Sequence, residues 1–140
     1  MKTRTSGFSL IELMIAVAII GILASIAIPL FTQFLAKSKI SAGLSEIGAL
    51  RAGVQDAIEN NEISNPTLSQ IGAPSNSTNC SLALTVQSGI TTLSCTLVNP
   101  PSSISGGVVS YIRSAGGAWT CQMNSAIAAS YVPSGCVRGN

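Results

Sequence analysis

Histidine is absent from this 140-residue chain, and only 9% of its residues are charged. Without histidine the chain lacks the commonest general base and the commonest neutral metal ligand. Its few basic residues form no dense patch, so charge gives no argument for nucleic-acid binding. Asp56 is the sole aspartate and no serine has a visible base, so we predict no catalytic residue, no enzyme and no cofactor.

Apolar residues, in contrast, make up 46% of the sequence, which excludes intrinsic disorder. They are concentrated in residues 8–36, where Glu12 is the only charged residue. As a helix this run would measure roughly 43 Å, enough to cross the hydrocarbon of a bilayer. Lys2 and Arg4 precede it, as in a secretory signal peptide, but no convincing small-residue cleavage site follows the apolar core. We therefore predict a transmembrane helix.

Glu12 is an unusual residue for such a segment. An acid within an apolar span costs roughly 2.5 to 3.5 kcal/mol on insertion scales, so it requires a partner. A structural explanation is that Ser9 and Glu12 form a capping box at the helix start. Gly21 and Pro29 interrupt the same span, and because glycine weakens a helix and proline removes a backbone hydrogen bond, we expect a kink or local unwinding there.

The string GFSLIELMIAVAIIGILASIAIP, from Gly7 to Pro29, closely resembles the start of type IV prepilins. The resemblance implies that a prepilin peptidase cuts between Gly7 and Phe8 on the cytoplasmic side, removing residues 1–7 as a leader. It also implies N-methylation of the new Phe8 amine. Glu12 would then pair with Phe8 of a neighbouring subunit and set the register of assembly. The short leader and Phe8 resemble the type IVa branch.

A second helical segment follows the apolar run. Its apolar residues recur every three or four positions and predict one buried helix face: Ile40, Leu44, Ile47, Leu50, Val54 and Ile58. The charged residues are interpreted as a solvated face: Lys39, Glu46, Arg51, Asp56 and Glu59. We predict a filament-core helix over 8–36, an amphipathic continuation over 37–62 that ends near Asn60, and a head over 63–140.

The head is predicted to contain two hairpins. Its strands are expected at Leu82–Val86 and Ile90–Val98, then at Val108–Arg113 and Ala118–Met123. They would form a four-stranded antiparallel sheet that packs on the helix stripe, giving an α+β fold with one long helix. The aromatic residues of this region are interpreted as packing groups: Tyr111, Trp119 and Tyr131.

All four cysteines lie in the head, which indicates an oxidising compartment. Four cysteines allow three pairings. We prefer Cys80 with Cys95, because their positions are symmetric about the first predicted hairpin and place them opposite each other. Cys121 and Cys136 would enclose a loop that resembles the disulfide-bounded C-terminal region of type IVa pilins. The cysteines lack paired Cys-x-x-Cys spacing, so a metal site is not favoured.

As a function, the resemblance implies a structural subunit of a retractable surface filament that serves twitching motility, adhesion or DNA uptake. Implied partners are other copies of the chain in a helical homopolymer, the prepilin peptidase and methyltransferase, inner-membrane pilus assembly machinery, minor pilins, and a host surface or DNA. The precursor would reside in the inner membrane. A minor pilin and a type II secretion pseudopilin are alternatives. Another is a membrane-anchored periplasmic binding module, in which Glu12 would act only as a cap.

Overall fold

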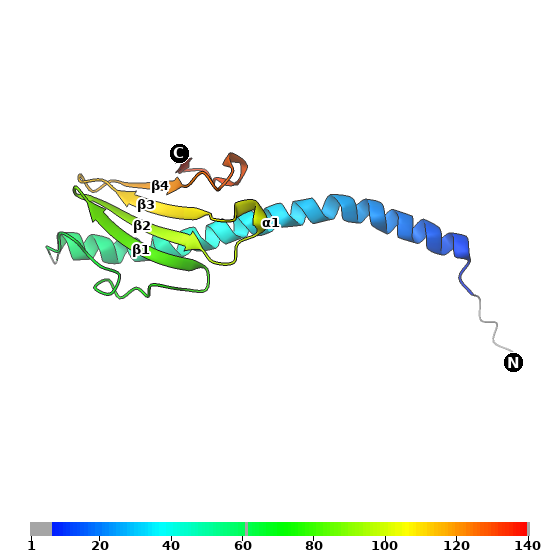
Figure 1. Cartoon of the computed structure of the whole chain (residues 1–140), viewed down its shortest axis with the longest axis horizontal. Helices are drawn as coiled ribbons and strands as arrows, with labels where there is room; N and C mark the ends of the chain where they lie inside the picture. The colour runs from blue at the N-terminus through cyan, green and yellow to red at the C-terminus, as the bar shows by residue number, and fades with distance from the viewer. Residues whose placement is uncertain (1–6, 61, 140) are drawn as a thin grey trace.

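A single long helix and a small sheet make up the molecule, whose computed structural model describes residues 7–60 and 62–139. Helix α1 runs without interruption over Leu10–Glu59, a length of 50 residues. Its first half projects away from the rest of the chain, and its second half lies along the sheet (Figure 1). Of the predicted leader, only Gly7 is described. Residues 1–6, which include Lys2 and Arg4, lie outside the described residues.

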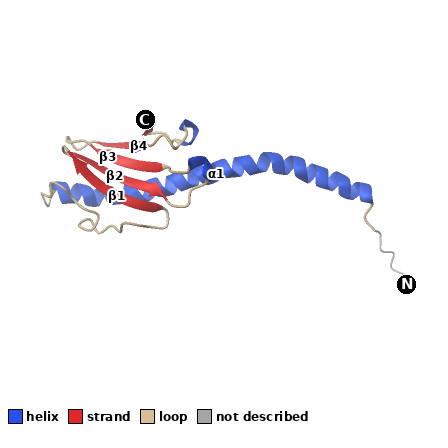
Figure 2. Ribbon diagram, in the orientation of Figure 1, coloured by secondary structure: helices blue, strands red, loops and turns tan. Residues whose placement is uncertain are grey.

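The sheet has five strands in the order of the sequence. They are β1 (Cys80–Gln87), β2 (Ile90–Leu97), β3 (Val108–Arg113), β4 (Trp119–Met123) and β5 (Cys136–Arg138). Two short 3-10 helices lie in the connections, at Ser102–Ile104 and Ala129–Tyr131. Figure 2 shows the strands stacked side by side over the second half of α1. The α+β prediction is confirmed by this arrangement.

The predicted number of strands was too low by one. Strands β1 to β4 pair antiparallel as expected, but β5 adds to β4 in parallel. Strand β5 has only three residues, of which Cys136 is half-buried and the other two are exposed. A segment of this length shows no alternation of apolar and polar residues, and its parallel pairing depends on a crossover connection that sequence pattern does not reveal.

The register of the first hairpin also differs from the prediction. Cys95 pairs with Leu82, and Cys80 pairs with Leu97, so the two cysteines are offset by two positions and do not lie directly opposite each other. The cause is the two-residue turn, in which Ser88 and Gly89 have φ of 52° and 77°. Positive φ at both central residues fits a turn whose twist matches that of the strands. Because side chains alternate with period two, both cysteines still lie on one face.

The core lies between α1 and the inner face of the sheet. Three residues of the predicted helix stripe, Ile40, Ile47 and Val54, are fully buried. From the sheet, Leu93 and Val109 are fully buried against them. The other members of the stripe are partly buried and pack on this cluster: Leu44, Leu50 and Ile58. The helical period therefore predicted correctly which face of the second half of α1 forms the core.

Gly43 marks a tight approach of α1 to the sheet. A Cβ at this position would lie 2.8 Å from Leu97 Cδ2 and 3.1 Å from Cys95 Sγ. The Gly43 carbonyl oxygen lies 3.9 Å from Cys80 Sγ. Cys80 and Cys95 are fully buried and bonded to each other, so their sulfur atoms have little freedom to move away from an added side chain. The absence of a side chain at Gly43 therefore allows the helix to rest on the disulfide.

We expect Gly43→Ala to destabilise the head. Alanine favours the helix by about 1 kcal/mol, but overpacking of a closed core costs about 1–3 kcal/mol, so the net loss is up to about 2 kcal/mol. Gly48→Ala is the matched control, because a Cβ there would lie an ordinary 3.8 Å from Tyr111 Cε2. Thermal unfolding of the full chain in detergent, followed by circular dichroism, measures both. Equal melting temperatures for the two variants would refute the packing argument.

Candidate assembly surface

The first half of α1 leaves its apolar side chains exposed. From Phe8 to Leu35 every large apolar side chain is exposed, from 75% at Phe8 to 40% at Leu35. An 18-residue window of the helix has a mean hydropathy of 2.7 and none of it is buried. In the described part of the chain, α1 is the one helix long and apolar enough to cross a membrane. A surface of this size and character marks contact with lipid or other protein.

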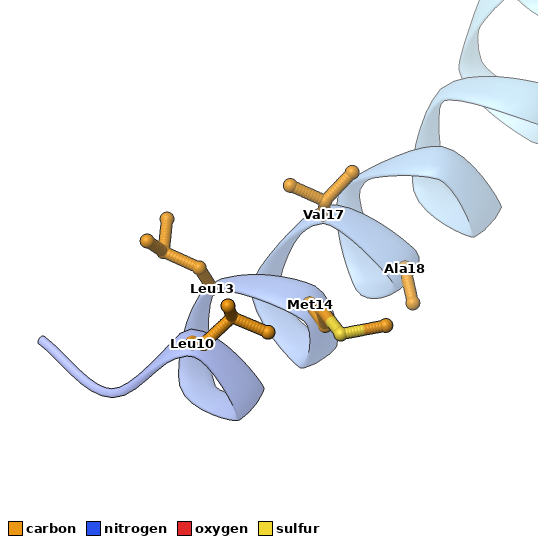
Figure 3. Close-up of a pocket in the computed structure, with 5 residues that line it drawn as sticks. All are labelled: Leu10, Leu13, Met14, Val17 and Ala18. Atoms are coloured by element: carbon orange, nitrogen blue, oxygen red, sulfur yellow. The ribbon is translucent and has the colours of Figure 1, made fainter.

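The start of this surface is a row of apolar side chains without a polar group. Figure 3 shows Leu10, Leu13, Met14, Val17 and Ala18, which line a shallow groove along the first turns of α1. Their side chains point outward from the helix. Such a groove offers van der Waals contact to another apolar helix or to acyl chains, and offers no donor or acceptor to a polar ligand.

The Glu12 side chain lies on this surface, exposed, and makes no hydrogen bond or ion pair with any described residue. The capping box is not formed. Ser9 is the N-cap, but its side chain makes no capping hydrogen bond, and only its carbonyl oxygen accepts the Glu12 N–H, at 3.1 Å. Capping by Ser9 therefore does not account for the acid in this structure. Its position in the first turn is favourable to the helix dipole.

Gly7 and Phe8 precede the helix in an exposed, non-helical stretch. A Cβ built on Gly7 would meet no atom within 4 Å. A peptidase must bind extended backbone and approach it closely, and a glycine outside regular structure permits this. The structure thus places the Gly7–Phe8 bond where an enzyme could reach it.

Gly21 and Pro29 lie within an unbroken helix, so the local unwinding that we expected is absent from this structure. The helix instead bends gently in its first half (Figure 1). Pro29 cannot donate a hydrogen bond to the carbonyl one turn earlier. The Ser25 hydroxyl donates to the Ile22 carbonyl at 2.7 Å, and the Thr32 hydroxyl donates to the Pro29 carbonyl at 2.9 Å. Such bonds bend a helix and compete with its backbone ladder.

We expect Pro29→Ala to strengthen α1 locally. The substitution restores one backbone hydrogen bond and removes the crowding of the preceding turn, a gain of up to about 3 kcal/mol in helix propensity. In the full chain solubilised in detergent, amide hydrogen exchange between residues 21 and 33 should be slower in the variant, while exchange in the strands stays the same. Full protection of this segment in the unmodified chain would show that Pro29 does not loosen the helix.

Two disulfides hold the head together, and they are the pairs preferred from the sequence. Cys80–Cys95 joins β1 to β2 with a Cα–Cα distance of 5.0 Å, and Cys121–Cys136 joins β4 to β5 with a distance of 4.5 Å. Cys121 and Cys136 are direct partners in the parallel ladder. The second bridge thus closes the C-terminal loop and attaches β5. No group of metal-binding side chains is found among the described residues.

The interpretation of the charged helix face as solvated is wrong for Glu46. Its carboxylate accepts hydrogen bonds from the Ser77 hydroxyl and from Asn79 Nδ2, the latter at 2.7 Å. Lys39 Nζ donates to Asn79 Oδ1 at 2.9 Å. These contacts attach the loop before β1 to the helix. Pattern alone could not show them, because the partners lie more than thirty residues away in an irregular segment.

Glu59 is exposed, as the interpretation of a solvated face requires, but its carboxylate also pairs with a buried arginine. Arg113, only 6% exposed, pairs through Nη2 with Glu59 Oε1 at 3.0 Å. Arg113 Nε donates to Gln55 Oε1 at 2.9 Å, and Trp119 Nε1 donates to the same oxygen at 3.1 Å. The end of α1 is therefore attached to β3 and β4 by polar contacts as well as by the apolar core. No local pattern in the sequence indicates that Arg113 would be buried.

Comparison with known proteins defines the class. Residues 36–137 match the pilin family of bacterial filament proteins, and residues 2–28 match the prokaryotic N-terminal methylation motif. A crystal structure of a Cs1 pilin chimera shares the fold, with a TM-score of 0.60 at 18% identity, and covers 74% of this chain and 98% of its own. The chain belongs to the pilin family, whose members are structural subunits and not enzymes.

Several relatives are similar over nearly their whole length. Fimbrial protein EcpB of Eikenella corrodens is 34% identical, covering 96% of this chain and 98% of its own. The type IV major alpha-pilin of Moraxella bovis is 35% identical, with 94% and 96% covered. The type IV major fimbrial protein FimA of Dichelobacter nodosus is 33% identical, with 97% and 98% covered. The resemblance to type IV prepilins is thereby confirmed.

Proposed function

We propose that this chain is the major structural subunit of a type IV pilus. The observation that carries the proposal is the exposed apolar first half of α1, up to Leu35. It begins within a methylation motif and continues into a disulfide-bonded head. In the filament this half packs against other copies as the core, and the head forms the outer surface. Relatives named as major pilins favour this function over a minor pilin or a type II secretion pseudopilin.

Before assembly, we propose, the same apolar half crosses the inner membrane. The span from Phe8 to Ala36 is long enough for the hydrocarbon, and the lysines at positions 37 and 39 follow it directly. Inner-membrane assembly machinery then adds the subunit to a filament on the cell surface, together with minor pilins. Retraction of that filament is the proposed basis of twitching motility, adhesion to a host surface or DNA uptake.

Processing gives Glu12 a partner, which it lacks among the residues that the structure describes. Cleavage of the Gly7–Phe8 bond creates an amine at Phe8, and methylation leaves it a positively charged secondary amine. A carboxylate in apolar surroundings is tolerable when such a cation lies within hydrogen-bonding reach. Glu12 lies in the first turn of α1 and Phe8 lies outside the helix, two residues before its start, and we propose that the amine of a neighbouring subunit fills this role. The pair would then set the axial register between copies.

The test is the intact mass of protein recovered from sheared surface filaments, together with Glu12→Gln and Met14→Leu strains viewed by electron microscopy. We expect a chain that begins at methylated Phe8. We expect Glu12→Gln to reduce filaments at least about tenfold, because it removes one charge of the pair. Met14→Leu, a volume-conserving change on the same exposed surface, should leave filaments unchanged.

A different result would identify an alternative. A chain that retains Met1, with no filaments in any strain, would contradict the pilus subunit and favour the membrane-anchored binding module. Filaments of normal number in Glu12→Gln would contradict the proposed pairing with Phe8, even if the mass showed correct processing. The two measurements therefore separate processing from assembly.

A further inference from the structure

Lys39 lies on α1 at the point where the exposed apolar surface ends and the head begins. Leu35, the last large side chain of that surface, is 40% exposed, whereas Ile40 is fully buried in the core. Lys39 itself is half-buried. Its Nζ donates to Asn79 Oδ1 at 2.9 Å and makes no other hydrogen bond or ion pair with a described residue. Because an ammonium group carries three N–H donors, two of them remain for a ligand.

The acceptor that Lys39 uses is itself held in place. Asn79 is half-buried, and its Nδ2 donates to the Glu46 carboxylate at 2.7 Å, which leaves its Oδ1 turned to Lys39. The Ser77 hydroxyl donates to the same carboxylate. Glu46 is therefore engaged by neutral groups and makes no ion pair with Lys39. The ammonium is thus positioned by an amide, and no carboxylate in contact with it neutralises its charge.

A cavity of about 470 Å³ opens beside this ammonium, where α1 leaves the head. One wall is α1, with Leu35, and the other is the loop after β2, with Asn99 and Pro101. Among the described residues that line the cavity, Lys39 alone is charged. The 3-10 helix at Ser102–Ile104 follows this loop and packs on α1, so the loop is held against the helix (Figure 1). The cavity therefore joins a cation and polar groups to the end of an apolar surface.

The position of Lys39 along α1 matches the thickness of a membrane. The stretch of α1 from Glu12 to Lys39 measures about 40 Å at the helical rise of about 1.5 Å per residue. A bilayer with its headgroups measures about 40–45 Å. When Glu12 lies at one face of the bilayer, Lys39 lies among the headgroups of the other face. Leu35 then lies near the edge of the hydrocarbon, so the cavity opens at the level of the lipid phosphates.

We propose that this cavity, the Lys39 pocket, binds the headgroup of an anionic phospholipid such as phosphatidylglycerol. The phosphate would accept hydrogen bonds from the two remaining Lys39 donors and from the Asn99 amide, which is exposed and makes no hydrogen bond with a described residue. The acyl chains would run from Leu35 along the exposed apolar first half of α1. A lipid fits this place because one ligand meets a cation and an apolar surface together.

The inference rests on the proposed function, since it requires that the first half of α1 crosses a membrane before assembly. It adds to that stage a specific lipid, which would fix the depth of the head at the membrane surface. Packing of other copies against α1 would later displace the acyl chains.

The experiment counts the lipids that stay bound to the full chain. The chain is solubilised in a non-ionic detergent and titrated with phosphatidylglycerol, or with phosphatidylcholine of the same acyl chains, and bound lipids are counted by native mass spectrometry. We expect one phosphatidylglycerol to bind saturably and at least about fivefold more tightly than phosphatidylcholine. Inorganic phosphate, which lacks the apolar part, should bind at least about tenfold more weakly than phosphatidylglycerol.

Lys39→Gln should weaken phosphatidylglycerol binding at least about fivefold, because it removes the charge that meets the phosphate. Lys37→Gln is the matched control, since it removes the same charge from a nearby exposed position that does not line the cavity. Solvent screens that charge, so binding should change by less than about twofold.

Asn99→Gly is a second variant, which removes the amide and keeps every charge. Glycine suits the positive φ of 48° at this position, and the exposed Asn99 side chain has no hydrogen bond with a described residue to lose. We expect binding of phosphatidylglycerol about threefold weaker. If Lys39→Gln lowers the melting temperature, Asn99→Gly decides between a lost contact and a disturbed fold.

Three results would overturn the proposal. Equal losses in Lys37→Gln and Lys39→Gln would show a general attraction of lysines to anionic lipid. Equal affinity for phosphatidylcholine would show that the headgroup charge is not recognised. Inorganic phosphate that binds as tightly as the lipid would show a site for a free anion. The measurement needs neither cleavage nor filaments, so its failure leaves the pilus subunit standing, and a failed filament test leaves this measurement readable.

Discussion

Water cannot solvate the apolar surface that α1 presents before Ala36 without a cost of about 25 cal/mol for each Å² exposed. The head covers only the second half of the helix, so the first half must be covered by something else. Lipid and other copies of the same helix both satisfy this need. Because acyl chains are about as apolar as leucine, replacing lipid by other copies of the helix gains little hydrophobic free energy. Van der Waals fit, together with the proposed pairing of Glu12, must therefore favour the polymer.

The head is a small domain, so its stability cannot come from a large apolar core alone. Its sheet has one face on α1 and a core of few large side chains, so it depends on the closeness of that contact and on covalent cross-links. Gly43 brings the first disulfide against the helix. Two polar clusters, one at Glu46 and one at Arg113, then attach the loop before β1 and the end of α1 to the same framework.

Periodicity in the sequence predicted the elements that repeat over many residues. The apolar run and the stripe through Ile47 gave α1 and its buried face, and the alternating segments gave β1 to β4. What it missed depends on single residues. The register of the first hairpin followed from positive φ at Ser88, and β5 from a three-residue pairing. The burial of Arg113 follows from contacts between distant segments, which no local pattern records.

The continuity of α1 between its bare half and the head has a mechanical consequence. A pull on the exposed end acts along the helix, which is unbroken between that end and the head in the described chain. The load therefore reaches the contacts at Ile40, Ile47 and Val54 together, so they must slide past the sheet as a group and cannot open one after another. Contacts loaded in shear resist far more force than contacts that are peeled apart. The long helix thus makes each subunit a link that carries tension without unravelling its head.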